Sequence, residues 1–207
     1  MYSENKELII RSSSEAVDFA LLKDGKLIEL HKEQETSNFQ VGDIFIAKIR
    51  KPVAGLNAAF VNVGFEKDAF LHYHDLGPNL SSQLKFIKLV SAGKLKDFSL
   101  KTFQFEKEID KDGTVTDVLS ANQSVLVQVV KEPISTKGPR ISAELSLAGR
   151  FIVLVPFSDR VSISQKIEDK KEKDRLKRLV QSIKPKGFGV IVRTVAEGKN
   201  TAELEKD

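Results

Sequence analysis

Apolar and polar residues alternate in short runs along the first part of the chain, a pattern typical of β-strands. Residues 7–33 contain two such runs, with Asp24-Gly25 between them. That dipeptide favours a two-residue hairpin turn, since both turn positions adopt positive φ. We therefore predict a small antiparallel, hairpin-rich layer, which is marginally stable unless it packs against another surface.

The next stretch predicts several short strands. They are expected at residues 44–49, 58–63 and 69–71, with turns at Gly55 and Gly64. A strongly β-branched strand is expected over residues 123–132, and residues 141–148 are a further strand candidate. Short strands at regular spacing, separated by glycines, favour a small β-barrel or sandwich.

Residues 78–122 interrupt this pattern. The segment is polar, contains two runs of lysine, and has weak periodicity with many turn-forming residues. We predict an insertion in a loop of the barrel, partly mobile and without regular elements.

The last third of the chain combines strands with a helix. Residues 151–155 are consecutively apolar, which indicates a buried strand. Leu176, Leu179, Val180 and Ile183 form one apolar stripe at helical spacing. Pro185 and Gly187 end that helix, a strand follows over residues 188–198, and residues 201–207 read as the start of another helix. The predicted fold class is α+β and β-rich.

Composition excludes several classes of site and leaves a polyanionic partner open. The 207 residues include no cysteine, which excludes disulfides, thiol catalysis and cysteine-ligated zinc. No apolar run reaches the roughly 20 residues of a membrane span, and the N-terminus lacks a signal-peptide core, so we expect a soluble, cytoplasmic protein. The net charge is +4, but residues 131–194 hold 15 Lys+Arg against 7 Asp+Glu, which is +8. A well-solvated lysine-rich helix would account for part of that excess.

Candidate chemistry is sparse apart from one phosphate-binding pair. Arg193 and Thr194 follow a strand and precede a glycine loop, where a guanidinium fork and a hydroxyl suit phosphate oxygens. His72 and His74, two residues apart on a strand, share one face, so a metal-binding pair and ordinary packing are both open. Asp110 and Asp112 are read as a simple turn. No hydrolase triad and no glycine-rich phosphate loop occurs in the sequence.

Four ordered stretches together carry a resemblance to a known family: LNAAFVNVGFEKDAFL, QSVLVQVVKEPISTKGPR, SLAGRFIVLVPFSDRVSISQKIE and GFGVIVRTVAEGKNTAEL. They closely resemble the N-terminal part of the ribonuclease E/G family, and within it the G branch. These are bacterial endoribonucleases of ribosomal and transfer RNA processing and messenger RNA decay. The resemblance runs from about residue 7 to residue 207 and is weakest across residues 78–122.

The resemblance implies a layout of three parts. Residues 1–39 are similar to the first piece of an RNase H-like subdomain. Residues 40–145 resemble an OB-fold RNA-binding domain, which carries the insertion at 78–122. Residues 146–207 resemble a truncated 5′-sensor region.

The resemblance also implies site residues. Phe60 and Phe70 match aromatic residues that stack on single-stranded RNA, and Lys137 matches an RNA-contacting lysine. From the residues alone, barrel core is the favoured interpretation of Phe60 in AAFVNV. Gly149, Val153, Arg193 and Thr194 match the pocket for a 5′-monophosphate. Arg150 adds a candidate contact beside Gly149, and Gln165 stands where the family leads us to expect an arginine.

The resemblance implies a magnesium-dependent endoribonuclease whose catalytic carboxylates belong to a later subdomain. We therefore expect this chain to be a truncated region that binds 5′-monophosphorylated single-stranded RNA without cutting it, and that has no catalytic residue, metal site or cofactor of its own. We also expect the orphaned first layer to cause self-association. The alternative is a stand-alone RNA-binding or scaffold protein.

Overall fold

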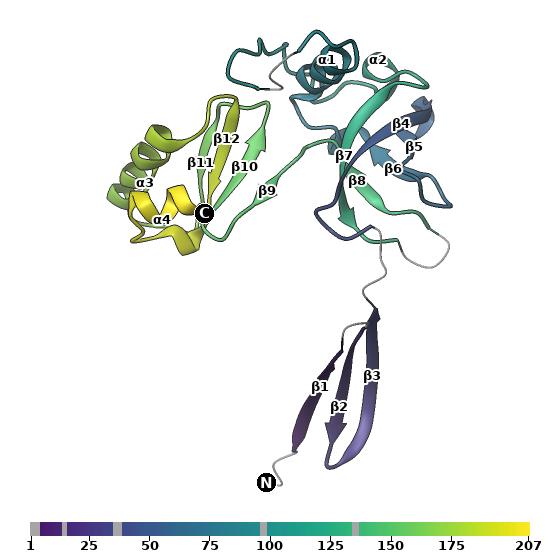
Figure 1. Ribbon diagram of the computed structural model, residues 1–207, viewed down its shortest axis with the longest axis vertical. Helices are drawn as coiled ribbons and strands as arrows, with labels where there is room; N and C mark the ends of the chain where they lie inside the picture. Colours follow the sequence, from purple (N-terminus) through teal and green to yellow (C-terminus); the bar gives the residue numbers. More distant parts are fainter. Residues whose placement is uncertain (1–4, 14–15, 35–38, 96–98, 134–136) are drawn as a thin grey trace. The chain divides into compact units, whose positions relative to one another are not determined.

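The chain folds into two compact units that divide between residues 38 and 39 (Figure 1). The computed structural model describes residues 5–13, 16–34, 39–95, 99–133 and 137–207. No helix in these ranges is long and apolar enough to cross a membrane.

The first unit is a three-stranded antiparallel sheet. Its strands are β1 (Lys6–Ser12), β2 (Ala16–Lys23) and β3 (Lys26–Gln34), paired in that order. Asp24 and Gly25 make the predicted β2–β3 turn, with φ of 49° and 73°. The predicted hairpin layer is therefore confirmed outside residues 14–15, which are not among the described ones. None of the side chains described in these strands is fully buried, so the unit has no core of its own.

The second unit contains a closed five-stranded barrel. Its strands are β4 (Ile44–Val53), β5 (Ala58–Asn62), β6 (Ala69–His72), β7 (Ser124–Lys131) and β8 (Arg140–Ser142). They pair in the order β4-β5-β6-β8-β7, and the circle closes through the parallel pair Phe70–Arg140 of β6 and β8. The predicted barrel and its first four strands are confirmed. The candidate strand at 141–148 is instead divided between β8 and a short β9 (Leu147–Ala148).

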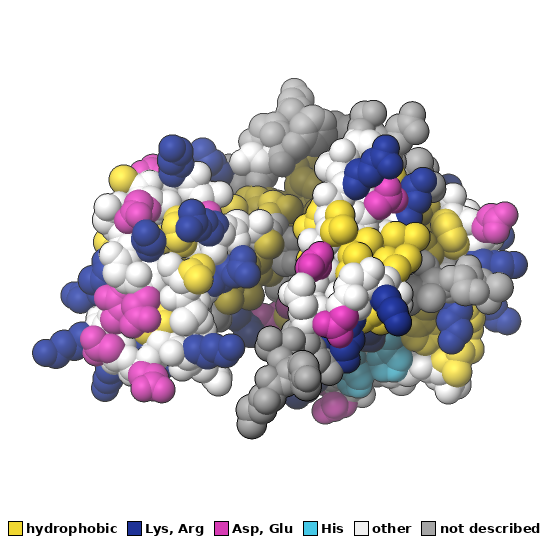
Figure 2. All heavy atoms as spheres, turned by 90° about the horizontal axis from the view of Figure 1, so that it is seen from below, with side chains coloured by type: hydrophobic (Ala, Val, Ile, Leu, Met, Phe, Trp, Pro, Cys, Tyr) yellow, Lys and Arg dark blue, Asp and Glu magenta, His cyan; other side chains and the backbone are white. Residues whose placement is uncertain are grey.

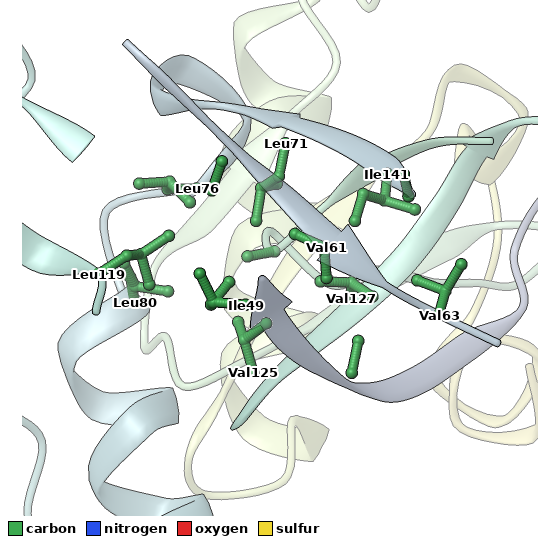
Figure 3. Close-up of a cluster of buried hydrophobic side chains, with 14 of the residues drawn as sticks. Ile49, Val61, Val63, Leu71, Leu76, Leu80, Leu119, Val125, Val127 and Ile141 are labelled. Atoms are coloured by element: carbon green, nitrogen blue, oxygen red, sulfur yellow. The ribbon is translucent and has the colours of Figure 1, made fainter. Parts of the chain in front are cut away.

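Alternation along the strands builds the barrel core (Figure 3). Ile49, Val61, Leu71, Val125 and Ile141 are fully buried and form one hydrophobic cluster. Burying one such side chain contributes about 1.5–3 kcal/mol. Because side chains alternate along a strand, the residues next to these in sequence, such as Phe60 and Phe70, face outward.

The prediction that residues 78–122 lack regular elements is wrong. The segment contains α1 (Leu80–Ser91) and the short α2 (Val115–Val118). Helix α1 buries Gln83, whose side-chain amide donates to the carbonyl oxygen of Ala143 at 3.0 Å and whose oxygen accepts from the Leu126 amide at 3.2 Å. Because the helix contacts the protein on more than one side, its apolar positions do not form the single stripe that reveals a surface helix.

A second sheet follows the barrel. It contains β10 (Ile152–Pro156), β11 (Val161–Ile163) and β12 (Phe188–Val192) in the order β11-β12-β10-β9. The predicted helix is confirmed as α3 (Lys170–Ile183), which buries Leu176 and Val180 against the sheet. The predicted last helix is α4 (Thr201–Lys206). The prediction of a buried strand at residues 151–155 is confirmed only in part, because β10 is half-buried throughout: Ile152 and Leu154 pack against the cluster that holds Leu176 and Val180, and Val153 lies outside it.

Candidate nucleic-acid interface

An open cavity of about 700 Å³ lies at the end of β12. It is lined by Arg150, Phe151, Ser164, Lys166, Ile191, Val192, Arg193, Thr194, Val195 and Lys199. Four of these residues carry a positive charge and none carries a negative one. Such a cavity suits an anionic ligand with an apolar part.

Arg193 and Thr194 enter this cavity from the 3₁₀ turn that follows β12. The Arg193 amide donates to the carbonyl oxygen of Phe151 at 2.8 Å, which continues the β10–β12 pairing. One guanidinium nitrogen of Arg193 donates to the carbonyl oxygen of Gly149 at 2.8 Å. Since a guanidinium has five N–H donors, this bond fixes the group and leaves further donors for a ligand.

Thr194 is paired with a residue that the sequence analysis did not single out. Its hydroxyl lies 2.9 Å from the Ser164 hydroxyl, which follows β11. Strands β11 and β12 run parallel, so their carboxyl ends bring the two hydroxyls to the same edge. The cavity therefore combines two hydroxyls with a guanidinium.

Gly149 is held by the last residue of the chain. The Asp207 carboxylate accepts hydrogen bonds from the amides of Arg150, Phe151 and Ile152 at 2.8, 3.0 and 3.0 Å. A Cβ added at Gly149 would collide with this carboxylate. A side chain at this position would displace the carboxylate from the turn, and that turn presents the carbonyl group that accepts from Arg193.

Asp207 is held in its charged form by these contacts. Burial alone would raise the pKa of its carboxyl group, but the three amide donors and the nearby Arg193 charge outweigh burial, so the pKa is lowered. The amides are thereby satisfied within the protein, and the donors left for a ligand are side-chain groups.

Val153 lies beside the cavity rather than among its lining residues. It pairs with Ile191 across β10 and β12, and cross-strand partners share one face of a sheet. Ile191 lines the cavity and is 44% exposed. Val153 therefore belongs to the apolar floor next to the charged groups.

The loop behind the cavity is tied to α3. Glu172 accepts from Arg175 at 2.6 and 2.7 Å and from the Gly198 amide at 2.8 Å. The bond from Arg175, then the Gly198 amide, lowers the pKa of Glu172 to about 2. Arg175 also donates to the carbonyl oxygen of Lys199 at 2.9 Å. These bonds hold Lys199 at the cavity, where its ammonium lies 5.2 Å from the centre of the Phe151 ring.

A second cavity, of about 620 Å³, lies on the barrel and brings the three expected RNA contacts together. Phe60 and Phe70 are cross-strand partners in β5 and β6, with ring centres 6.0 Å apart. The cavity is lined by Phe60, Lys67, Asp68, Phe70, Lys137, Gly138, Pro139 and Arg140. Two exposed rings can stack on bases, and the basic side chains beside them can neutralise phosphates.

The reading of Phe60 as barrel core is wrong. Phe60 is 36% exposed and Phe70 is 38% exposed, while their neighbours Ala59, Val61 and Leu71 fill the core. Lys137 follows residues 135–136 of the STKG loop, which are outside the described part of the chain.

His72 and His74 do not share one strand face as a ligand pair. His72 ends β6, and its Nδ1 accepts from the His74 amide at 3.2 Å, which caps the following 3₁₀ turn. Among the described residues, no three His, Asp or Glu side chains gather in a way that could hold a metal ion. Asp110 accepts from the Asp112 amide at 3.1 Å, as the predicted turn requires.

The structure adds several residues to the two cavities that sequence reasoning had not chosen. Ser164 and Lys166 flank Gln165, which is exposed but does not line the cavity. Their position within one of the four resembling stretches is the signal that could have identified them. Lys199 and Arg140 also lie within resembling stretches, so their position and their charge together could have identified them. The basic side chains are spread over the visible face among acidic ones rather than forming one uniform patch (Figure 2).

The family profile and the similar proteins found for this chain all belong to one family. The Ribonuclease E/G family profile matches residues 146–207. The chain is 32% identical to Ribonuclease G of Escherichia coli K12 over 201 residues, which are 97% of this chain and 37% of that protein. Ribonuclease G of Haemophilus influenzae gives the same identity and coverage. Ribonuclease E of a Nostoc species is 36% identical over 173 residues, 83% of this chain and 21% of that protein. The chain thus spans little more than a third of the two G-type relatives.

Proposed function

Because the chain belongs to the ribonuclease E/G family, we propose that it binds single-stranded RNA and recognises a 5′-monophosphate as part of an endoribonuclease. The observation that carries this proposal is the cavity in which Arg193, Thr194 and two lysines meet, with no carboxylate among its lining residues. The Phe60–Phe70 cavity supplies a second contact for the same strand.

In this proposal the terminal phosphate binds at Arg193 and Thr194. The guanidinium supplies charged donors, and the Thr194 and Ser164 hydroxyls can turn toward the phosphate oxygens. A 5′-hydroxyl would leave these donors without an acceptor, and a triphosphate would bring extra bulk. Phe151 and the apolar floor at Val153 and Ile191 offer a surface for the first nucleotide.

The aromatic cavity then holds bases farther along the strand. Stacking on an exposed ring contributes about 1–3 kcal/mol per base and tolerates any base. Lys137, Lys67 and Arg140 would neutralise the backbone, which predicts affinity that falls as salt rises.

Hydrolysis is proposed for the whole enzyme and not assigned to any residue of this chain. Magnesium would supply metal-assisted phosphodiester hydrolysis there. The described residues contain no group of three carboxylates or histidines able to hold the ion. The second candidate function is an RNA-binding or scaffold protein that does not cut. Magnesium-dependent cleavage by pure chain, abolished by a substitution in it, would contradict both expectations.

The first test concerns Arg193. We expect Arg193→Ala to remove most of the preference for a 5′-monophosphate over a 5′-hydroxyl on the same RNA, because the phosphate loses its charged donors. Fluorescence anisotropy with the two RNAs measures this preference. Arg178→Ala is the matched control, since Arg178 lies on the exposed face of α3 and outside the cavity lining. Equal binding of both RNAs by the unmodified chain would refute the phosphate assignment.

The second test concerns Phe60. Phe60→Ala should weaken RNA of either 5′ end by about 5- to 150-fold, the equivalent of about 1–3 kcal/mol of stacking. The same anisotropy assay measures it. Leu56→Ala, at an exposed apolar side chain outside the cavity, is the control. Normal RNA binding by Phe60→Ala would contradict the proposed stacking of Phe60 on RNA.

A further inference from the structure

Residues 99–110 are anchored to helix α1 and to the turn that follows β6. The Glu106 amide donates to the Ser82 hydroxyl at 2.8 Å, and the Lys85 ammonium lies 2.6 Å from the Glu106 carboxylate. The buried Tyr73 hydroxyl donates to the carbonyl oxygen of Asp110 at 2.5 Å. Burial, then the negative charge of Asp110, raises the pKa of Tyr73, so the hydroxyl stays a donor. These contacts hold residues 99–109 in place against α1 and Tyr73.

The same segment packs against the loop that follows β10. Phe103 on the segment and Phe86 on α1 meet Phe157 edge to face, with ring centres 6.2 and 5.4 Å apart. Phe157 is 6% exposed and has a φ of +62°, which is costly for a residue with a bulky side chain. Such a conformation persists only where the surroundings enforce it, and here the surrounding rings belong to the inserted segment.

A second contact lies at the start of β12. Leu100, 8% exposed, belongs to the same hydrophobic cluster as Phe157. A Cβ added at Gly187 would lie 2.5 Å from the Leu100 Cβ and 3.0 Å from its carbonyl oxygen. The backbones of the two segments therefore approach as closely as glycine permits.

A third contact is polar and lies at the surface. One guanidinium nitrogen of Arg160 donates to both carboxylate oxygens of Glu108, at 2.6 and 2.8 Å. The side chains are 71% and 46% exposed, so the pair adds little stability. It does fix the direction of approach, because the guanidinium plane and the carboxylate must align.

We propose that residues 99–109 form a brace that holds the barrel and the β9–β12 sheet in one arrangement, so that a single RNA strand occupies both cavities at once. Figure 1 shows the segment after α1 reaching from the barrel toward β12. Without such contacts, two bodies joined by a short link move relative to each other. With them, binding in one cavity presents the strand to the other at high effective concentration. This inference rests on the proposed function of the two cavities.

The brace therefore sets which RNA is preferred: one with both a 5′-monophosphate and a single-stranded stretch long enough to reach the barrel. Residues of the brace act as positioning residues and need not touch RNA. Their loss should reduce the advantage of a bridging strand without weakening either cavity alone.

The experiment compares three probes on the complete chain. They are a single-stranded RNA of about 12 nucleotides with a 5′-monophosphate, the same RNA with a 5′-hydroxyl, and a 5′-phosphorylated dinucleotide; the length follows from the roughly 4–16 nucleotides that an OB-fold covers. For Phe103→Ala combined with Arg160→Ala, we expect the advantage of the long phosphorylated RNA over the hydroxylated one to fall about tenfold. Dinucleotide affinity should stay unchanged.

Matched variants separate positioning from folding. Asp159→Asn, which breaks a nearby ion pair with Lys184 within the sheet region, should leave all three affinities unchanged. The exchange of charges in Glu108→Arg with Arg160→Glu should retain the advantage, whereas Glu108→Arg alone should lose part of it. Because these variants are at the surface, they remain informative if Phe103→Ala fails to fold.

The outcomes distinguish this inference from the function on which it rests. If the brace variants keep the full advantage while Arg193→Ala and Phe60→Ala lose binding, the brace is refuted and the proposed function stands. If Arg193→Ala and Phe60→Ala have no effect, both are refuted. A parallel fall in dinucleotide affinity would also refute the brace, since it would indicate damage to the sheet itself.

Discussion

At the residue scale, a single carboxylate organises the turn beside the cavity that Arg193 lines. Asp207 gathers three consecutive amides of the β9–β10 turn and leaves the Gly149 carbonyl group free to accept from Arg193. Three donors in a row would otherwise form an anion-binding concavity. The Asp207 carboxylate fills it, so under the proposed function the phosphate would bind at Arg193 instead.

Replacement of Asp207 should therefore disturb both stability and recognition. We expect Asp207→Asn to lower the unfolding temperature by about 2–4 °C, the equivalent of roughly 1 kcal/mol for a chain of this size. The preference for a 5′-monophosphate should fall as well, since the turn that fixes Arg193 loosens. Thermal unfolding and RNA anisotropy measure the two effects.

The stability effect of Asp207 depends on pH in a definite direction. Its pKa is lower in the folded chain than in the unfolded one, so its contribution is present above the unfolded value of about 3.9 and is lost as pH falls through the folded value. The difference in unfolding temperature between the unmodified chain and Asp207→Asn should thus disappear below about pH 4. Glu205→Gln, at an exposed position on α4, is the control. A gap that is constant with pH would exclude the charge as the cause.

Sequence reasoning reached Arg193 and Thr194 but not the residues that support them. The former follow a recognisable strand and lie in a resembling stretch, so local pattern and resemblance together pointed to them. Asp207 contacts residues 55–57 positions earlier, and Ser164 contacts Thr194 across 30 positions. No local pattern encodes such partners, because they depend on which strands the sheet brings together.

At the scale of elements, α1 is the one that the sequence concealed. Its buried positions include Ser82 and Gln83 beside Leu80 and Ile87, so polar residues stand where a surface helix would be apolar. The helix is specified by hydrogen bonds to the barrel instead. In contrast, α3 has the apolar stripe of a helix that packs on one side only, and its bounds were predictable.

Gln83 should consequently be among the costliest polar residues to remove. Gln83→Ala would leave the Leu126 amide and the Ala143 carbonyl group without their partner, at a cost of about 2–4 kcal/mol for two buried groups. Urea unfolding measures the loss. Gln181→Ala, at an exposed position on α3, should change stability by less than about 0.5 kcal/mol. Equal effects of the two variants would show that α1 adds little to the fold.

At the scale of the whole molecule, the first unit is a sheet without a core. Leu8, Ile10, Leu27, Ile28 and Leu30 are all more than half exposed. A three-stranded sheet of this kind needs a surface to pack against. The hairpin was predictable from Asp24-Gly25 because a turn has a local sequence signal. A packing surface has no such signal.

Self-association of the chain is the expected result. We predict that sedimentation velocity detects dimers or larger species whose fraction rises with protein concentration, because two copies can cover each other's apolar strands. Ile28→Lys should reduce that fraction. Leu56→Lys, at an equally exposed position on the barrel side, should not. A strict monomer at high concentration would contradict the prediction.

The barrel closes through the parallel pair Phe70–Arg140, and both residues line the aromatic cavity. A barrel opens most readily at its shortest strand contact, so native-state fluctuations should concentrate there. RNA bound across Phe70 and Arg140 would join the two sides of this seam, and whatever binds only the closed form also stabilises it. Bound RNA would then hold the barrel closed, and the rate at which the barrel opens at this pair would report whether RNA is present.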